Sequence, residues 1–412
     1  MTDWRHEAEK TRDASREIAT LSTDVKNAAL VDLADAIAAN KAVLLAANAE
    51  DLAAASDLPD AKRKRLSLSE SAVAQMVDGL RQIAALPDPV GAVASETVVP
   101  SGLRVRRVRC PLGVIMMIYE ARPNVTIDAF SLCFKSGNAC ILKCGREALR
   151  SSQALADLAH DALLRHGVPE SALTLLSTSD RKEIKALLAL DGLIDLVIPR
   201  GGESLVRFVY EHARMPVLAH FHGVCHVFVD KSADLEMALR ICVTGKTSAP
   251  ATCNATEAVL IRADIAKAFA PRLVAAYRDA GVEMVGDAAV CELATGVSPA
   301  QDDDWGREFL AMKVAVRVVA DINEAIEHIE RYGSNHTEVI VSSDAASIAE
   351  FQRRVQASCV LANASTRFND GYQLGLGAEI GISTSRIHAY GPMGLNELTT
   401  TRFVVDGDGQ CR

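Results

Sequence analysis

The sequence lacks any apolar run near the ~18 residues that a membrane-spanning helix requires. Its first twenty residues, MTDWRHEAEKTRDASREIAT, are charged throughout and lack the apolar centre of a secretory signal. Net positive charge is also absent, because 44 Lys and Arg face 53 Asp and Glu and give a formal net charge of -9. No overall field would hold a nucleic acid. We therefore expect a soluble cytoplasmic protein that binds neither membrane nor nucleic acid.

One basic cluster, Lys62-Arg63-Lys64-Arg65, interrupts this acidic balance. Such clusters sometimes bind nucleic acids. No aromatic residues are interleaved here for base stacking, which favours the reading of a solvated loop or helix end.

Two phosphate-binding motifs are missing as well. No G-x-G-x-x-G opens a helix after a strand, and Arg240 stands where a P-loop ending in Gly245-Lys246-Thr247 needs its first glycine.

The segment HFHGVCH (220–226) holds possible metal ligands, namely His220, His222, Cys225 and His226. Because no second ligand cluster is evident, we favour buried or cavity-lining histidines and expect no metal.

What remains is the pattern of a large folded protein of 412 residues, 49% hydrophobic, with room for two or three domains. Helical periodicity predicts helices at 20–55 and 69–85, and alternation predicts a strand or hairpin near 98–109. From Pro111 short apolar runs alternate with helices, and a second such unit runs from about 226 to 363. This order predicts an α/β protein with parallel sheets.

Ten cysteines scattered over so long a chain are typical of buried thiols, not of a disulfide framework. Cys253 differs in its surroundings, because SAPATCN forms a short loop between an expected helix and strand. Such a loop exposes a sulfur and aims backbone N–H groups at it. From the pattern alone, a nucleophile and a core thiol both remain open.

Several long segments resemble one family, the γ-glutamyl phosphate reductases of the aldehyde dehydrogenase superfamily. The segments are PLGVIMMIYEARPNVT (111–126), SGNACILKCGREA (136–148), DLVIPRGG (195–202), TCNATEAVL (252–260), VADINEAIEHIERYGSNHTEVI (319–340), VLANASTRFNDG (360–371), LGLGAEIGIST (374–384) and GPMGLNELTT (391–400). The resemblance implies NADPH-dependent reduction of L-glutamate 5-phosphate to glutamate 5-semialdehyde and phosphate, a step of proline biosynthesis.

Within the resemblance, Cys253 matches the catalytic cysteine, whose thiolate attacks the acyl phosphate to form a thioester. The backbone N–H of Cys253 and the side chain of Asn124 are the implied oxyanion contacts; a helix N-cap is the alternative for Asn124. Hydrolytic relatives keep a glutamate some thirty residues before the cysteine, whereas no acid occurs here between Glu211 and Asp230. The thioester should therefore await hydride or phosphate.

The superfamily binds its dinucleotide without the glycine fingerprint, and the resemblance assigns the NADPH contacts to six residues. These are Lys143 and Glu147 at the adenosine ribose, Arg200, Gly201 and Gly202 at the diphosphate or nicotinamide, and Glu308 at the nicotinamide ribose. A cation at Lys143 suits a 2′-phosphate. A solvated charge is the alternative for Lys143 and Glu308.

The anionic substrate suggests arginine ligands, for which Arg122 and Arg367 are candidates; structural pairing with a carboxylate is the alternative. The resemblance further implies an NADPH-binding domain at 1–225, a catalytic domain at 226–367, and a tail at 368–412. That tail pairs with the strand near 98–109 as an oligomerisation arm, which gives a homodimer or homotetramer.

Three further readings follow. An associated glutamate 5-kinase would deliver the labile acyl phosphate. An ordinary hydrolytic aldehyde dehydrogenase and a catalytically silent superfamily member are the competing functions.

Overall fold

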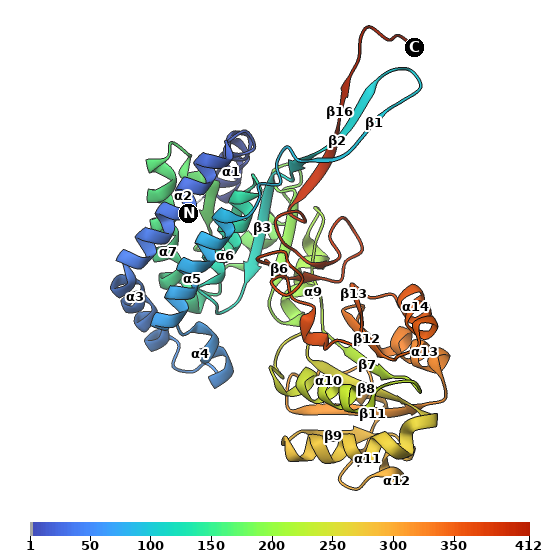
Figure 1. Cartoon of the computed structure of the whole chain (residues 1–412). Helices are drawn as coiled ribbons and strands as arrows, with labels where there is room; N and C mark the ends of the chain where they lie inside the picture. Colours follow the sequence, from blue (N-terminus) through green and yellow to red (C-terminus); the bar gives the residue numbers. More distant parts are fainter. Residues whose placement is uncertain (1–2) are drawn as a thin grey trace.

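The computed structural model describes residues 3–412, which form two α/β bodies and a projecting arm (Figure 1). A sheet of four parallel strands, in the order β5-β4-β3-β6, organises the first body. Its strands are β3 (Val114–Tyr119), β4 (Ala139–Lys143), β5 (Leu173–Leu175) and β6 (Leu196–Arg200). They are the short apolar runs of the sequence, and nearly every residue in them is buried under helices.

The helices of this sheet follow its strands along the chain. They are α6 (Val125–Lys135), η1 (Arg146–Ala148), α7 (Leu149–Arg165), η2 (Glu170–Ala172), α8 (Arg181–Leu187) and α9 (Glu203–His212). Because all four strands are parallel, the segments after Tyr119, Lys143 and Arg200 leave the sheet at the same edge. Open α/β sheets bind ligands at this carboxyl edge.

A layer of N-terminal helices packs onto the first body. Its members are α1 (Trp4–Ile18), α2 (Thr23–Ala39), α3 (Lys41–Ala54), α4 (Asp60–Leu66) and α5 (Glu70–Ala85). The predicted continuous helix over 20–55 is wrong at Asn40, where α2 ends and α3 begins. The Asn40 side-chain amide donates to the carbonyl of Ala36 at 2.8 Å and competes with the helical backbone.

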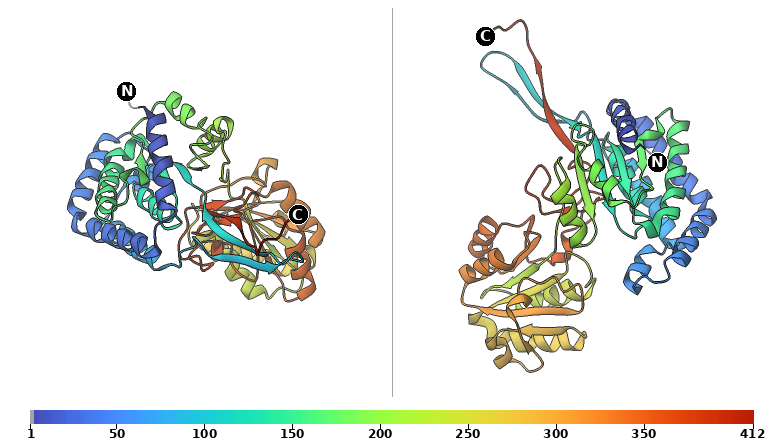
Figure 2. Two further views of the ribbon diagram at one scale, coloured as in Figure 1. Left: turned by 90° about the horizontal axis from the view of Figure 1, so that it is seen from above. Right: turned by 180° about the vertical axis from the view of Figure 1, so that it is seen from behind.

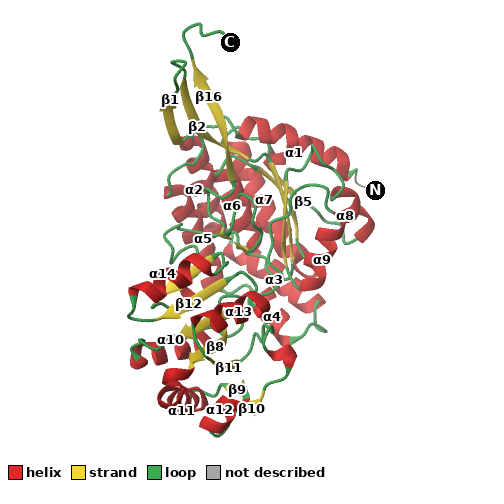
Figure 3. Ribbon diagram, turned by 90° about the vertical axis from the view of Figure 1, so that its right-hand side faces the viewer, coloured by secondary structure: helices red, strands yellow, loops and turns green. Residues whose placement is uncertain are grey.

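The second body is built on seven parallel strands in the order β10-β9-β11-β8-β7-β12-β13. They are β7 (Cys225–Val229), β8 (Thr256–Arg262), β9 (Glu283–Gly286), β10 (Ser298–Pro299), β11 (Lys313–Val319), β12 (Thr337–Val341) and β13 (Cys359–Ala362). Its helices are α10 (Leu235–Thr247), α11 (Ala263–Asp279), α12 (Ala288–Leu293), η3 (Asp302–Asp304), α13 (Ile322–Tyr332), α14 (Ala345–Arg354) and η4 (Thr366–Phe368). Helices α10 and α11 bury one face of the sheet, and α13 and α14 bury the other (Figure 3).

The arm is an antiparallel sheet of β1 (Val93–Val98), β2 (Arg104–Pro111) and β16 (Thr399–Asp406). The region near 98–109 is therefore a hairpin, with its turn at 99–103. The last strand of the chain pairs with β2 from Thr399 opposite Pro111 to Asp406 opposite Arg104, as the sequence predicted. The view from behind shows this sheet projecting away from both bodies (Figure 2, right).

Between the second body and the arm, the chain returns to the first body through 369–398. This segment contains the short strands β14 (Ile382–Ser383) and β15 (Gly391–Pro392). At its start Asn369 donates to Thr337 in the second body, and further on Ile380 and Leu398 join the core of the first. The return segment thus connects the two bodies. Across residues 3–412 no helix has the length and apolar character of a membrane span.

Candidate active site

Cys253 lies in the loop that connects α10 to β8, and polar contacts fix this loop on both sides of the sulfur. Arg367 donates to the hydroxyl of Thr252 at 2.7 Å, and the side-chain amide of Asn254 donates to the carbonyl of Asn369 at 2.9 Å. Both partners belong to the chain just after β13. The position of the cysteine therefore depends on residues more than a hundred positions away.

The other side of the loop presses against the segment before β7. The Sγ of Cys225 donates to the carbonyl oxygen of Cys253 at 3.2 Å. A Cβ added at Gly223 would lie 2.1 Å from the same oxygen, so only glycine allows this approach.

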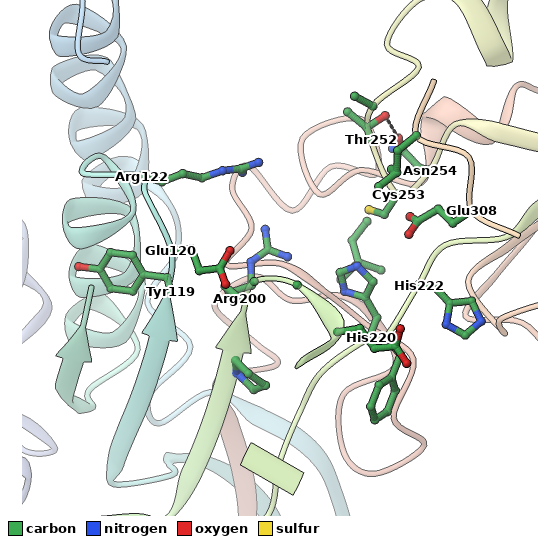
Figure 4. Close-up of a pocket in the computed structure, with 18 of the residues that line it drawn as sticks. Tyr119, Glu120, Arg122, Arg200, His220, His222, Thr252, Cys253, Asn254 and Glu308 are labelled. Carbon is green, nitrogen blue, oxygen red and sulfur yellow. Dashed lines mark hydrogen bonds between the residues drawn. The ribbon is translucent and has the colours of Figure 1, made fainter. Parts of the chain in front are cut away.

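A cavity of about 760 Å³ opens in front of the half-buried cysteine, between the first and second bodies (Figure 4). The EARPN turn and the start of α9 line it from the first body. From the second body come the cysteine loop and the segment around Glu308, and the return segment completes it. A volume of this size accommodates a small substrate together with part of a cofactor.

The charged groups around the Cys253 sulfur have opposing effects on the pKa of its thiol. Burial raises the pKa of the Cys253 thiol to about 11; the Arg200 cation acts to lower this pKa, and the carboxylates of Glu308 and Glu379 act to raise it. At neutral pH the free protein therefore holds this residue mainly as the thiol.

Arg200, Gly201 and Gly202, predicted as cofactor contacts, lie at the end of β6 and line the cavity. Gly202 is the N-cap of α9 and, having no side chain, leaves the first N–H groups of that helix without a side-chain acceptor. A Cβ at Gly201 would meet Glu120 at 2.9 Å, which explains the glycine there. Bare backbone at a helix N-terminus is suited to an anionic group.

Glu308 also lines the cavity, beside Cys253 (Figure 4). Burial raises the pKa of its carboxyl group, while the backbone N–H of Gly223 and the Lys246 cation act to lower it. Glu308 is half-buried, so it is not the freely solvated charge that the sequence left open as an alternative.

The two arginines predicted to bind substrate meet at the cavity from opposite walls. Arg122 extends from the turn after β3 toward Cys253, and Arg367 lies beside Thr252 (Figure 4). Among residues 3–412 no carboxylate oxygen comes within 4.0 Å of either guanidinium, which is the contact the structural alternative required.

Three predicted site residues lie away from this cavity. Asn124 is not among the lining residues; it occupies the predicted N-cap position of α6, but its side chain makes no cap hydrogen bond and its amide donates to Asp128 at 3.0 Å. Lys143 ends β4, half-buried. Glu147 lines a second cavity of about 480 Å³ beside α3, and it accepts the backbone N–H of Ala121 at 3.1 Å.

The histidines of HFHGVCH separate into two groups. His220 and His222 line the cavity, and burial lowers the pKa of His220 to about 4, so its ring is neutral at pH 7. His226 is fully buried, with its Nδ1 2.9 Å from Glu338. Within the described part of the chain no group of three or more His, Cys, Asp or Glu side chains is placed to hold a metal.

Sequence reasoning missed several cavity residues, among them Glu120, Asp370 and Glu379. The predicted solvated loop or helix end at 62–65 is a short helix on which Lys62 and Arg65 are exposed, but the sequence did not show that both also line the cavity. The gap in acidic residues between Glu211 and Asp230 does not leave the cavity free of carboxylates, because Glu308 and Glu379 arrive from distant segments. Their contribution was not visible from residues near the cysteine.

A parallel-sheet body with a crevice at its carboxyl edge, facing a cysteine loop on a second α/β body, is the architecture of an aldehyde dehydrogenase. The aldehyde dehydrogenase family model matches residues 2–306. The gamma-glutamyl phosphate reductase of Xylella fastidiosa (strain 9a5c) is 53% identical over 414 residues, covering 100% of both chains. That of Salinibacter ruber is 51% identical over 401 residues, covering 97% of this chain and 92% of the other.

A crystal structure of the gamma-glutamyl phosphate reductase from Thermotoga maritima superimposes with a TM-score of 0.97 at 40% identity, covering 100% of both chains. The chain thus belongs to the aldehyde dehydrogenase family and, within it, to the gamma-glutamyl phosphate reductases.

Proposed function

We propose that this chain reduces L-glutamate 5-phosphate to L-glutamate 5-semialdehyde, releasing phosphate, with NADPH as reductant and Cys253 as nucleophile. The observation that carries the proposal is the full-length identity of about half to named gamma-glutamyl phosphate reductases, joined to a cavity where Cys253 faces several arginines. Guanidinium groups match both the carboxylate and the phosphate of this substrate.

The chemistry assigned to Cys253 begins with its thiolate forming a bond to the acyl carbon. The carbon–oxygen bond to phosphate then breaks, and phosphate leaves with that electron pair. The backbone N–H of Cys253 interacts with the cysteine's own sulfur and is the donor we assign to the oxyanion. The side chain of Asn124 is hydrogen-bonded to Asp128 and does not line the cavity. We therefore do not assign Asn124 a contact to the oxyanion.

The residues at the cavity suit a nicotinamide cofactor. The uncapped start of α9, with Gly202, would hold the diphosphate, and Glu308 would hold the nicotinamide ribose next to Cys253. Lys143 and Glu147, at the edge of the sheet beyond, would hold the adenosine ribose, and the Lys143 cation favours a 2′-phosphate. When bound, the cofactor supplies hydride to the acyl carbon.

Phosphate dependence tests this function. With glutamate 5-semialdehyde and NADP⁺, we expect NADPH to form over repeated turnovers only when phosphate or arsenate is present. One of these oxyanions must accept the acyl group from the thioester before the enzyme can turn over again. Phosphate-independent turnover at a comparable rate would contradict the proposal and favour a hydrolytic aldehyde dehydrogenase.

The identity of the nucleophile is tested by Cys253→Ala, with Cys291→Ala as a matched control, because Cys291 is also half-buried but lies outside the cavity. We expect loss of activity and of any acyl adduct detected by mass spectrometry in the Cys253 variant, and retention of both in the control. A Cys253→Ala protein that still rescues proline auxotrophy would point to a catalytically silent role for this chain.

Two assembly proposals accompany this function. The chain forms a homodimer or homotetramer through its arm, and a glutamate 5-kinase hands over the labile acyl phosphate directly. For the second, we expect excess Cys253→Ala protein to slow the coupled reaction of kinase and active reductase. An unchanged coupled rate would show that the intermediate diffuses freely.

A further inference from the structure

The basic cluster 62–65 is divided by the helix that carries it. Lys62 and Arg65 stand three residues apart on α4 and both line the cavity in front of Cys253. Arg63 instead donates to the backbone carbonyls of Leu52, at 3.2 Å, and of Ala55, at the end of α3. Lys64 is exposed and takes no part in the cavity wall. Lys62 and Arg65 are exposed as well, so half of the cluster lies on a solvent-open part of the cavity wall.

These two cations add to positive charge that forms no close ion pair in the described chain, although the carboxylates of Glu120, Glu203, Glu308, Asp370 and Glu379 line the same cavity. Within residues 3–412 no carboxylate oxygen lies within 4.0 Å of the side-chain nitrogens of Lys62, Arg65 or Arg122. The pKa of Arg122 is lowered, first by desolvation and then by the nearby cations of Arg200 and Arg65. Like charges that face one cavity without a carboxylate partner repel one another until an anion joins them.

Arg122 occupies the middle of this arrangement. The Arg65 cation acts to lower the pKa of Arg122, and Cys253 in its thiolate form acts to raise it, so Arg122 lies near both groups. Arg122 also points across the cavity toward the sulfur (Figure 4). The positive wall therefore runs from α4 of the N-terminal layer to the reacting cysteine.

We propose that Lys62 and Arg65 of α4, together with Arg122, bind a phosphoryl group in this cavity. The inference rests on the proposed function, which supplies two phosphoryl groups: the acyl phosphate of the substrate and the diphosphate of the cofactor. Both present several anionic oxygens, which suit two or three converging cations better than a single carboxylate does. The N-terminal layer is then part of the active site.

The experiment uses full-length Arg65→Gln and Lys62→Gln/Arg65→Gln proteins, with Lys64→Gln as the control that removes a charge from the same helix but not from the cavity. In the direction from semialdehyde to acyl phosphate, the KM for phosphate and the KM for NADP⁺ are measured separately. Arg65→Lys tests whether restoring the charge restores binding.

If the group is the substrate's acyl phosphate, the KM for phosphate rises about tenfold or more and that for NADP⁺ does not change. If it is the cofactor's diphosphate, the KM for NADP⁺ rises instead. In either case Lys64→Gln resembles the wild type and Arg65→Lys recovers part of the loss. Wild-type values of both constants in the double variant overturn the proposal.

A binding measurement keeps this test separate from the proposed reaction. Protection of Cys253 from alkylation by inorganic phosphate, and NADP⁺ binding by calorimetry, need no turnover. If the wild type shows no phosphate-dependent reaction, the proposed function fails, but phosphate and NADP⁺ binding still decide the role of α4. Equal binding of both by wild type and double variant again rules that role out.

Discussion

At the scale of single residues, the charges around Cys253 set its reactivity. With a pKa of about 11, the free protein holds only about one thiolate in ten thousand at pH 7. Arg200 is the cation that favours the thiolate, and Glu308 and Glu379 oppose it. A change to any of these charges should therefore alter how fast the sulfur reacts.

Glu379→Gln should lower the pKa of Cys253, because it removes a carboxylate that acts to raise that pKa. We expect alkylation of Cys253 by iodoacetamide at pH 8 to accelerate by up to about tenfold, which corresponds to one pKa unit. In the wild type, the rate should keep rising with pH until about 11. Quantitative mass spectrometry of the Cys253 peptide at several pH values measures this.

Two variants calibrate that experiment. Arg200→Gln should slow the reaction, since the charge that stabilises the thiolate is lost. Glu203→Gln removes a carboxylate from the same cavity that is not among the main charges acting on the thiol, so its rate should be near that of the wild type. Equal acceleration by Glu203→Gln and Glu379→Gln would show that a general field, not the position of Glu379, controls Cys253.

Gly223→Ala should displace the cysteine loop, because the new Cβ would lie 2.1 Å from the carbonyl oxygen of Cys253. We expect a loss of stability of about 1–3 kcal/mol and a larger proportional loss of turnover. Gly79→Ala, in α5 with no heavy atom within 4 Å of the new Cβ, should instead be neutral or stabilising. Thermal unfolding and activity assays compare the two; normal turnover in Gly223→Ala would show that the loop tolerates displacement.

At the scale of elements, a buried ion pair joins the two structures that carry the cysteine loop. Lys246 in the last turn of α10 lies 2.7 Å from Glu257 in β8, and both side chains are 0% exposed. The other oxygen of Glu257 accepts the backbone N–H of Leu310, near Glu308, at 3.4 Å. The pair therefore links the cysteine loop to the segment that supplies a predicted cofactor contact.

Lys246→Met should cost about 3 kcal/mol at pH 8, because burial already raises the pKa of Glu257 to about 7 and the loss of Lys246 would leave this group either charged without a partner or forced to take up a proton. The double variant Lys246→Met/Glu257→Leu should recover most of this loss, since no charge is left buried. Urea unfolding of both single variants, the double variant and the wild type gives the coupling energy. Additive losses in the double variant would mean that the pair is not coupled.

The sequence predicted the elements best where one apolar period repeats. The predicted alternation of short apolar runs and helices after Pro111 is confirmed, since β3, β4 and β6 are buried strands separated by helices. It failed at Asn40, where the backbone leaves helical geometry, with φ -101° and ψ 18°, within an otherwise continuous pattern. Cys253 was identified through the resemblance, because its loop alone favoured a core thiol over a nucleophile.

The rest of the site could not be predicted from local pattern because it is assembled from distant segments. Glu379 comes from the return segment, and Lys62 and Arg65 come from a helix of the N-terminal layer. Only the tertiary fold places these charges around one sulfur. The sequence of a basic cluster cannot show that two of its four residues line a cavity.

At the scale of the whole molecule, the arm exposes apolar side chains and strand edges that lack a neighbouring strand within residues 3–412. Phe403 and Val405 of β16 are 65% and 49% exposed, and Val93 and Val98 of β1 are 51% and 68% exposed. The outer edges of β1 and β16 have no neighbouring strand in the described chain. Exposed apolar residues on open strand edges are typical of sheets that another subunit completes.

Phe403→Asp/Val405→Asp should dissociate the oligomer, because both side chains lie on one face of β16 and would carry charge into the contact. Light scattering should give the wild type at two or four times the chain mass of 44.0 kDa, and the variant near 44.0 kDa. Arg402→Asp places a carboxylate on the opposite face of the same strand and should leave the mass unchanged.

A monomeric wild type, or a double variant that keeps its full mass, would show that the arm does not hold subunits together. Because the arm stands clear of the cysteine cavity, the dissociated protein should still bind NADP⁺, so lost assembly and lost folding can be told apart.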